Sequence, residues 1–222
     1  MDKLLSNFKI RVPETIYLKD PESSALGQNI ISGSIELIDS MGFESFNFKK
    51  LGVHIGSNES SIYRYFESKH KLLVYLSSWY WSWIEYRVVM ATFSLGDARG
   101  RLNGALEIIA EEVKEDSNFT YVNEVALNRI IVSESSKSFL TKSVDAENKA
   151  GNFESYKSLI QRLVIMIQEV CPDYPYAKSL SSTLVEASLH QHFLRDHFKS
   201  ITDCNSNGPL AFLADLVKKT LS

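Results

Sequence analysis

The chain has 222 residues, of which 44% are apolar and 23% charged, a balance typical of a globular protein with a sizeable core. Its net charge of −3 gives no sign of a nucleic-acid partner, and Cys171 and Cys204 have neither metal-ligand spacing nor the pattern of a secreted disulfide scaffold. The N-terminus lacks a signal-peptide core, and the apolar run 72–84 is too short to span a bilayer. We therefore expect a cytoplasmic protein without a membrane partner.

Residues 1–22 show no clear hydrophobic period, and we expect them to form an extended arm. A helix should follow, capped by Ser23 or Ser24 and ended by Gly42, because serine favours the first position and glycine the last. The apolar period places one stripe of this helix inward: Ile30, Ser34, Leu37, Ile38 and Met41.

Residues 42–71 have the layout of a helix-turn-helix. Asn47 can cap a short helix that would bury Phe48, Leu51 and Ile55, and Gly56-Ser57 forms the turn. Asn58 can cap a second helix, reaching Phe66 and burying Ile62 and Phe66. This helix would span roughly 13 Å, enough for a major groove about 12 Å wide. Gly52, inside the first helix, should cost about 1 kcal/mol relative to Ala.

The rest of the chain repeats helical patterns. A long helix should begin after Ser68 and end near Gly96, and another should begin at Asp97. Further helices are predicted at residues 119–134, 153–171 and 176–200, and a last one after the turn Asn205–Pro209. Residues 137–152 give no clear indication. Since no alternating strand pattern occurs, we predict an all-α protein.

The segment 42–73 resembles the DNA-binding domain of the TetR family of bacterial transcriptional regulators. The family pattern is found at Gly42-Phe43, Asn47, Leu51, Gly56, Asn58, Ser61-Ile62-Tyr63, Tyr65-Phe66, Lys69 and Leu72. Beyond residue 96 the resemblance is architectural only. It implies an N-terminal arm (1–22), a helix-turn-helix domain (23–71) and a C-terminal helical domain (72–222) for effector binding and dimerisation.

The resemblance also implies that Ser60, Ser61, Tyr63 and Arg64 approach DNA. Arg64 can make a bidentate contact to guanine, whereas Tyr63 and Lys69 are suited to phosphate.

Three more residues belong to the expected DNA-binding site. Backbone amides at the helix starts, Asn47 and Asn58, can donate to phosphate. Glu59 favours a helix start but repels phosphate, unless it accepts from a cytosine amine. The alternative is that all these side chains form a solvent-exposed polar face without a DNA contact.

Residues 41–71 carry five basic and three acidic side chains, a net charge of +2. Each subunit should therefore bind DNA only modestly, and dimerisation should double the charge.

Two further sites are expected in the C-terminal domain. Aromatic residues crowd the long helix, and although core packing explains most of them, Trp79, Trp83 and Met90 could line a pocket for an apolar or aromatic effector, as in family members. The helix at 176–200 and the last helix resemble the family's four-helix dimer interface. The predicted interface residues are Leu180, Leu184, Ala187, Ser188, Gln191, Leu194, Leu213 and Val217.

His190, His192 and His197 share one predicted helix. They could bind a metal, but we expect interface or pocket histidines, and we expect neither a metal nor a cofactor.

We predict a homodimeric, ligand-responsive regulator that binds a double-stranded operator, a repressor released by its effector. The alternative is a TetR-like protein with weak or lost DNA binding that acts through a protein partner. An enzyme using His192 and Asp196 is not expected.

Overall fold

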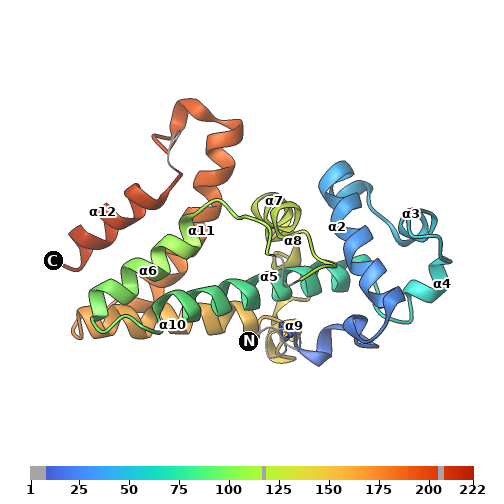
Figure 1. Cartoon of the computed structure of the whole chain (residues 1–222), viewed down its shortest axis with the longest axis horizontal. Helices are drawn as coiled ribbons and strands as arrows, with labels where there is room; N and C mark the ends of the chain where they lie inside the picture. Colours follow the sequence, from blue (N-terminus) through green and yellow to red (C-terminus); the bar gives the residue numbers. More distant parts are fainter. Residues whose placement is uncertain (1–8, 117–118, 205–207) are drawn as a thin grey trace. The chain divides into compact units, whose positions relative to one another are not determined.

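The computed structural model describes residues 9–116, 119–204 and 208–222, and every regular element in these ranges is a helix (Figure 1). The predicted all-α class is confirmed. The start of the predicted arm, up to residue 8, and residues 205–207 of the predicted last turn lie outside the described residues. Among the described helices, none has the length and hydrophobicity that a membrane crossing would need.

The described residues contain both α-helices and short 3-10 helices. The 3-10 helices are η1 (Glu14–Ile16), η2 (Pro21–Ser23) and η3 (Lys199–Ile201). The α-helices are α2 (Ala25–Ser45), α3 (Phe48–His54), α4 (Glu59–Ile62), α5 (Lys69–Thr92), α6 (Ala98–Ala110), α7 (Glu124–Glu134), α8 (Ser136–Phe139), α9 (Val144–Lys149), α10 (Glu154–Val170), α11 (Ala177–His197) and α12 (Leu210–Thr220).

These helices form two compact units, each assembled from two separate stretches of chain. Unit 1 combines Met1–Tyr80 with Val113–Ser155, and unit 2 combines Trp81–Glu112 with Tyr156–Ser222. Helix α5 passes from one unit into the other. This packing division is distinct from the functional division expected at residues 71 and 72, which stays a prediction.

Unit 1 is built on the contact between α2 and α7. Ile31, Ile35 and Ile38 of α2 and Ile130 and Ile131 of α7 are all at most 2% exposed. At the edge of this contact, the Arg129 guanidinium donates two hydrogen bonds, of 2.9 and 2.6 Å, to the carboxylate of Asp39. Segment 113–155 therefore supports the N-terminal helices through both apolar packing and an ion pair.

Helix α2 is broken at Gly42, close to where the sequence predicts its end. Gly42 has a φ of 77°, a conformation that glycine adopts without strain, and the chain then makes a short turn to Ser45. The amide of Phe43, freed by the break, donates to the Glu134 carboxylate at 3.1 Å. Lys137 forms ion pairs with Glu134 at 2.7 Å and with Glu44 at 3.1 Å. The end of α7 thus holds the break in α2.

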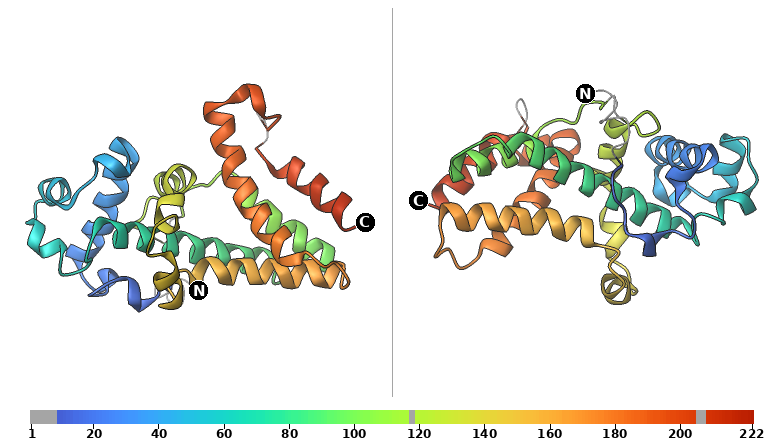
Figure 2. Two further views of the ribbon diagram at one scale, coloured as in Figure 1. Left: turned by 180° about the vertical axis from the view of Figure 1, so that it is seen from behind. Right: turned by 60° about the horizontal axis from the view of Figure 1, so that its bottom comes forward.

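In unit 2, α10 runs alongside the second half of α5 (Figures 1 and 2). Glu85 of α5 accepts hydrogen bonds from Ser158 at 2.8 Å and from Arg162 at 2.7 Å. The buried core of the unit also draws on α6, α11 and α12, and its most deeply buried side chains include Trp83, Val88, Leu102, Leu106, Leu159, Leu163, Leu184 and Leu213.

Gly52 is required by a close backbone approach within the helix-turn-helix. A Cβ at this position would lie 2.8 Å from the carbonyl oxygen of Ser57 and 3.3 Å from the amide nitrogen of Glu59. Both are backbone atoms, which cannot rotate away. The expectation that this glycine merely weakens α3 is therefore incomplete, because its missing side chain lets α3 and the following turn touch.

Gly52→Ala should destabilise the protein, although alanine is the better helix former by about 1 kcal/mol. The measurement is the free energy of urea unfolding. Gly104→Ala in α6 is the matched control, because its Cβ would meet only side-chain atoms, at 3.3 and 3.4 Å. We expect this control to be neutral or stabilised by up to about 1 kcal/mol. A Gly52→Ala protein more stable than wild type would contradict the packing argument.

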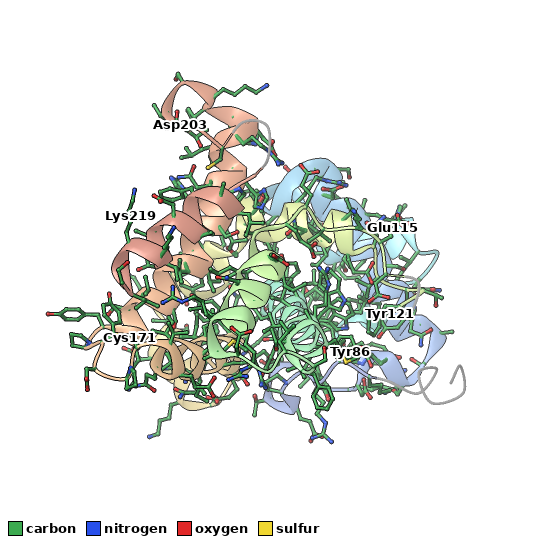
Figure 3. All side chains as sticks on the ribbon, turned by 60° about the vertical axis from the view of Figure 1, so that its left-hand side comes forward. Tyr86, Glu115, Tyr121, Cys171, Asp203 and Lys219 are labelled. Atoms are coloured by element: carbon green, nitrogen blue, oxygen red, sulfur yellow. The ribbon has the colours of Figure 1, made fainter. Side chains whose placement is uncertain are left out.

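Glu124, in the first turn of α7, is a buried carboxyl group. It is 1% exposed, and its Oε2 accepts a hydrogen bond of 3.2 Å from the amide of Asp116. Burial raises the pKa of Glu124 from 4.5 to about 7. The acidic side chains of Asp116 and Glu115 add to this increase in pKa (Glu115 is labelled in Figure 3). The folded protein therefore favours the protonated form more strongly than the unfolded chain does.

The contribution of Glu124 to the free energy of unfolding should consequently fall as the pH rises from about 4.5 to about 7, because the unfolded state loses the Glu124 proton first. Glu124→Gln, which stays neutral, should stabilise the protein at pH 8 more than at pH 5. The check is urea unfolding at both pH values, with the exposed Glu107→Gln as control. An equal effect of Glu124→Gln at the two pH values would exclude the raised pKa.

Candidate nucleic-acid interface

The predicted caps of the two short helices are confirmed. The Lys50 amide donates to Asn47 Oδ1 at 2.9 Å at the start of α3. Asn58 Oδ1 accepts three hydrogen bonds at the start of α4, from the Ser61 amide (2.8 Å), the Ser60 hydroxyl (2.7 Å) and the Ser61 hydroxyl (2.8 Å). These bonds occupy the side-chain oxygens and do not involve the backbone amides of Asn47 and Asn58, to which the phosphate contacts are assigned.

The second helix is shorter than predicted. It was expected to reach Phe66, but α4 ends at Ile62, and Tyr63–Tyr65 form a turn. The amide of Tyr65 bonds to the Ile62 carbonyl at 2.8 Å, three residues back, so the last turn is tighter than α-helical. This turn brings Phe66 back into the core, where it is fully buried. We call residues 59–66 the reading segment.

The apolar interior of the motif largely follows the prediction. Phe48, Leu51, Ile62 and Phe66 are each at most 3% exposed. Ile55 is an exception, since it is only partly buried, against Gly33 of α2. Its position at the turn after α3 leaves one side of the side chain uncovered.

The reading segment leaves a polar face outside the core. Glu59, Ser60 and Arg64 are exposed, and Ser61 is partly exposed. Tyr63 is 47% exposed, and its ring packs edge-on against Phe48 with centroids 5.0 Å apart. Arg64 forms no hydrogen bond or ion pair with any described residue. Its guanidinium is thus available to a ligand outside the chain.

Lys69 was predicted to hold phosphate, and the structure assigns it a different contact. Its ammonium group donates to the carbonyl oxygens of Phe43 (3.0 Å), Glu44 (3.2 Å) and Phe46 (3.2 Å). Since a lysine has three N–H donors, all of them are engaged. Lys69 therefore ties the start of α5 to the end of α2, and it has no donor left for a phosphate oxygen.

Sequence reasoning passed over two exposed residues of α3. Lys49 and Val53 are four residues apart and so share one face of this helix, and Val53 is 80% exposed. The available signal was that neither belongs to the predicted apolar stripe. Nearby, His54 and Glu36 form a 2.7 Å contact that fixes the end of α3 to α2.

The predicted effector residues do not share one cavity in either unit. Trp79 belongs to unit 1 and Trp83 to unit 2, each only 1% exposed. Trp79 packs edge-on against Phe119 at 5.2 Å, and Trp83 lies under Arg87 at 4.8 Å. Met90 is 61% exposed. The two tryptophans are thus core residues, and Met90 lies on the surface.

Unit 2 does contain an open groove of about 530 Å³ between α6 and α12. Its residues are Arg99, Leu102, Asn103, Leu106, Glu107, Leu210, Ala214, Asp215, Val217 and Lys218. None of the three predicted effector residues lines it.

Most of the predicted dimer residues are buried inside their own chain. Leu184, Leu213, Ser188 and Val217 are at most 3% exposed, and Leu180 and Leu194 at most 8%. The Ser188 hydroxyl donates to the Ile109 carbonyl at 2.6 Å, which explains why a small polar residue lies there. Only Ala187 and Gln191 are partly exposed. The apolar stripe of α11 therefore packs against its own unit.

The three histidines of α11 differ in environment. His190 and His197 are exposed, whereas His192 is buried and its Nε2 lies 3.2 Å from the Ala110 carbonyl oxygen. Burial lowers the pKa of His192, so the ring is neutral and its Nε2–H donates to this carbonyl. Within the described ranges, no three His, Cys, Asp or Glu side chains are grouped as a metal site would require.

Comparison with known proteins identifies the N-terminal segment. Residues 30–76 match the family model of the bacterial regulatory proteins of the tetR family. No curated protein matches the chain in sequence.

Solved structures resemble the chain over most of its length. A tetR-family regulatory protein from Rhodococcus RHA1 is 15% identical with a TM-score of 0.60, covering 89% of this chain and 96% of its own. AibR, solved with isovaleryl coenzyme A and operator DNA, is 14% identical with a TM-score of 0.57, covering 86% and 97%. The fatty acid degradation regulator FadR from Bacillus halodurans is 14% identical with a TM-score of 0.54, covering 85% and 92%.

At these identities the likeness shows the fold, and the family match at residues 30–76 adds the type of N-terminal domain. Residues 30–76 therefore match the N-terminal domain of the tetR family, and the chain as a whole shares its helical fold with these solved regulators.

Proposed function

We propose that this protein is a repressor that binds an operator in double-stranded DNA as a homodimer and releases it when a small effector binds. The observation that carries the DNA-binding part is the exposed, unengaged guanidinium of Arg64, next to the half-exposed ring of Tyr63 on the reading segment. Arginine can bond to both O6 and N7 of guanine in the major groove. Ser60, Ser61 and Glu59 would lie on the same face, and Tyr63 would contact phosphate.

The homodimer part of the proposal needs a contact face other than the predicted apolar stripe. The outer side of α11 offers Thr183, Glu186, Ala187 and His190, which recur at helical spacing and are exposed or partly exposed. On α12, the ring of Phe212 is 46% exposed. We assign the dimer contact to these two outer faces. Two reading segments must lie about one DNA turn apart, near 34–36 Å, for both to reach the major groove.

The effector part rests on likeness. AibR, with this fold, was solved with both isovaleryl coenzyme A and operator DNA. We place the effector in unit 2 and expect an apolar group in it, because the groove between α6 and α12 has the apolar side chains Leu102, Leu106, Leu210 and Val217 on its walls. An effector bound there can lower DNA affinity only if it binds the DNA-free state more tightly.

Arg64→Ala should remove most of the operator-specific affinity, because a bidentate arginine–guanine pair contributes about 1–3 kcal/mol and a dimer loses two. The operator is first selected from a random DNA pool with the wild-type protein. Binding is then compared by gel shift with Lys178→Ala, which removes one exposed positive charge from α11 and should leave binding intact. Arg64→Ala and wild type should unfold at the same temperature. Specific binding that survives Arg64→Ala would rule out the assigned reading segment.

The alternative function, a regulator that has lost DNA binding and acts on a protein, is favoured by one observation: Lys69 is engaged inside the chain. Three exposed cations, Lys49, Lys50 and Arg64, lie on each subunit near the reading segment, and Lys50 uses one of its three donors on the Ser45 carbonyl oxygen at 2.7 Å. If a dimer places all six on phosphates, the logarithm of the binding constant should fall with the logarithm of salt concentration at a slope of about −5. A slope near zero would instead support the protein-partner alternative.

A further inference from the structure

The reading segment is too short to hold its own conformation. Helix α4 has four residues, and an isolated helix of that length is not stable in water. Arg64, the residue proposed to read the base pair, lies beyond the helix in the turn Tyr63–Tyr65. The backbone of this turn must therefore be held by contacts from elsewhere in the chain.

Those contacts come from the N-terminal arm, and they converge on Tyr65. The amide of Leu18 donates to the Tyr65 carbonyl oxygen at 2.8 Å. The hydroxyl of Ser24 lies 2.8 Å from Tyr65 Oη, and the ammonium of Lys19 lies over the Tyr65 ring, 5.0 Å from its centroid. The backbone, ring and hydroxyl of one residue are thus each engaged, and Tyr65 is only 3% exposed.

The arm is itself anchored to unit 1. The Tyr17 ring meets the buried ring of Tyr75 on α5 edge-on at 6.0 Å. The hydroxyl of Tyr121 (labelled in Figure 3) donates to Glu22 at 2.6 Å, and burial and this carboxylate raise the pKa of Tyr121, which keeps it a donor. Farther back, Thr15 donates to Asn152 Oδ1 at 3.0 Å. Tyr65 is therefore held by a segment with its own fixed points.

We propose that residues 15–24 are a strap that positions Arg64 for DNA by fixing Tyr65, and this inference rests on the proposed DNA-binding function. The strap lies outside the family match, which begins at residue 30. Ordering a flexible loop during binding lowers affinity, so a turn that is already fixed binds more tightly. Residues of the strap need not touch DNA to change the affinity of the protein for its operator.

A double-mutant cycle on Ser24 and Tyr65 tests the strap. Tyr65→Phe removes only the hydroxyl, and Ser24→Gly removes its partner. Ser24→Gly also removes the 3.2 Å bond from the Gly27 amide to Ser24 Oγ, but glycine is accepted at the N-cap of α2 at a cost of only a few tenths of a kcal/mol. Without DNA, each single variant should exchange the amide hydrogens of Tyr65 and Phe66 about fivefold faster, as the loss of one hydrogen bond predicts. The double variant should be no faster than either, because both changes break the same contact.

The same variants are then measured with the operator selected by the wild-type protein. Each single variant should raise the Kd about fivefold, and the double variant should raise it no further. The control is Asn123→Ala, which removes the N-cap of α7, where Asn123 accepts from the Ala126 amide at 2.8 Å. Asn123→Ala changes no charge. It should lower the free energy of unfolding by about as much as the variants of the cycle do, and it should leave the Kd for the operator unchanged.

Unchanged exchange at Tyr65 and Phe66 in the single variants would overturn the strap. So would faster exchange with a wild-type Kd, because the strap would then be structural only. An Asn123→Ala Kd raised as far as that of the cycle variants would also overturn it. If the wild-type protein selects no DNA from the pool, the proposed DNA-binding function fails instead, and the exchange measurement alone decides whether the strap holds the turn.

Discussion

The structure of the DNA-binding end depends on one ammonium group that satisfies the end of a helix. Helix α2 is broken at Gly42, and just beyond the break, where the chain turns toward α3, the Phe43 carbonyl keeps one amide donor, that of Phe46 at 3.3 Å. Lys69 supplies three donors to this turn from the start of α5, at 3.0 to 3.2 Å, and its charge lies 4.7 Å from the centre of the Phe43 ring. Two of these carbonyl groups, those of Phe43 and Phe46, are partly buried, and the loss of the Lys69 donor there would destabilise the turn.

Fixing the two ends of the helix-turn-helix places the short helices between them. From Lys69, the chain runs back through Phe66 and the reading segment to the turn that touches Gly52. From Gly42, it runs forward through Phe46 to the cap of α3. Each of these steps is secured by a neighbour distant in sequence, such as Glu134 at the Phe43 amide or Leu18 at the Tyr65 carbonyl. Helices of four and seven residues persist because of these tertiary contacts, since their own hydrogen bonds are too few.

Local signals in the sequence were sufficient for part of this picture. The caps Asn47 and Asn58 and the buried Phe48, Leu51 and Ile62 were predictable, because capping and helical periodicity act over three or four residues. Lys69 was misassigned because its partners lie more than twenty residues away, and a lysine that holds carbonyls is indistinguishable by sequence from one that faces phosphate. Leu184 and Leu213 were recognised as apolar, but periodicity does not say whether an apolar face packs on its own chain or on a second copy.

The division of the chain into units has a consequence for how the protein folds. Unit 1 needs the stretch Val113–Ser155, which is synthesised only after Trp81–Glu112 of unit 2. The DNA-binding helices therefore cannot complete their core while they emerge, because α7 and its bonds to Asp39 and Phe43 are not yet available. Folding must wait for contacts of large sequence separation, which slows it. A nascent chain arrested before residue 113 should expose the apolar face of α2 and become a substrate for chaperones.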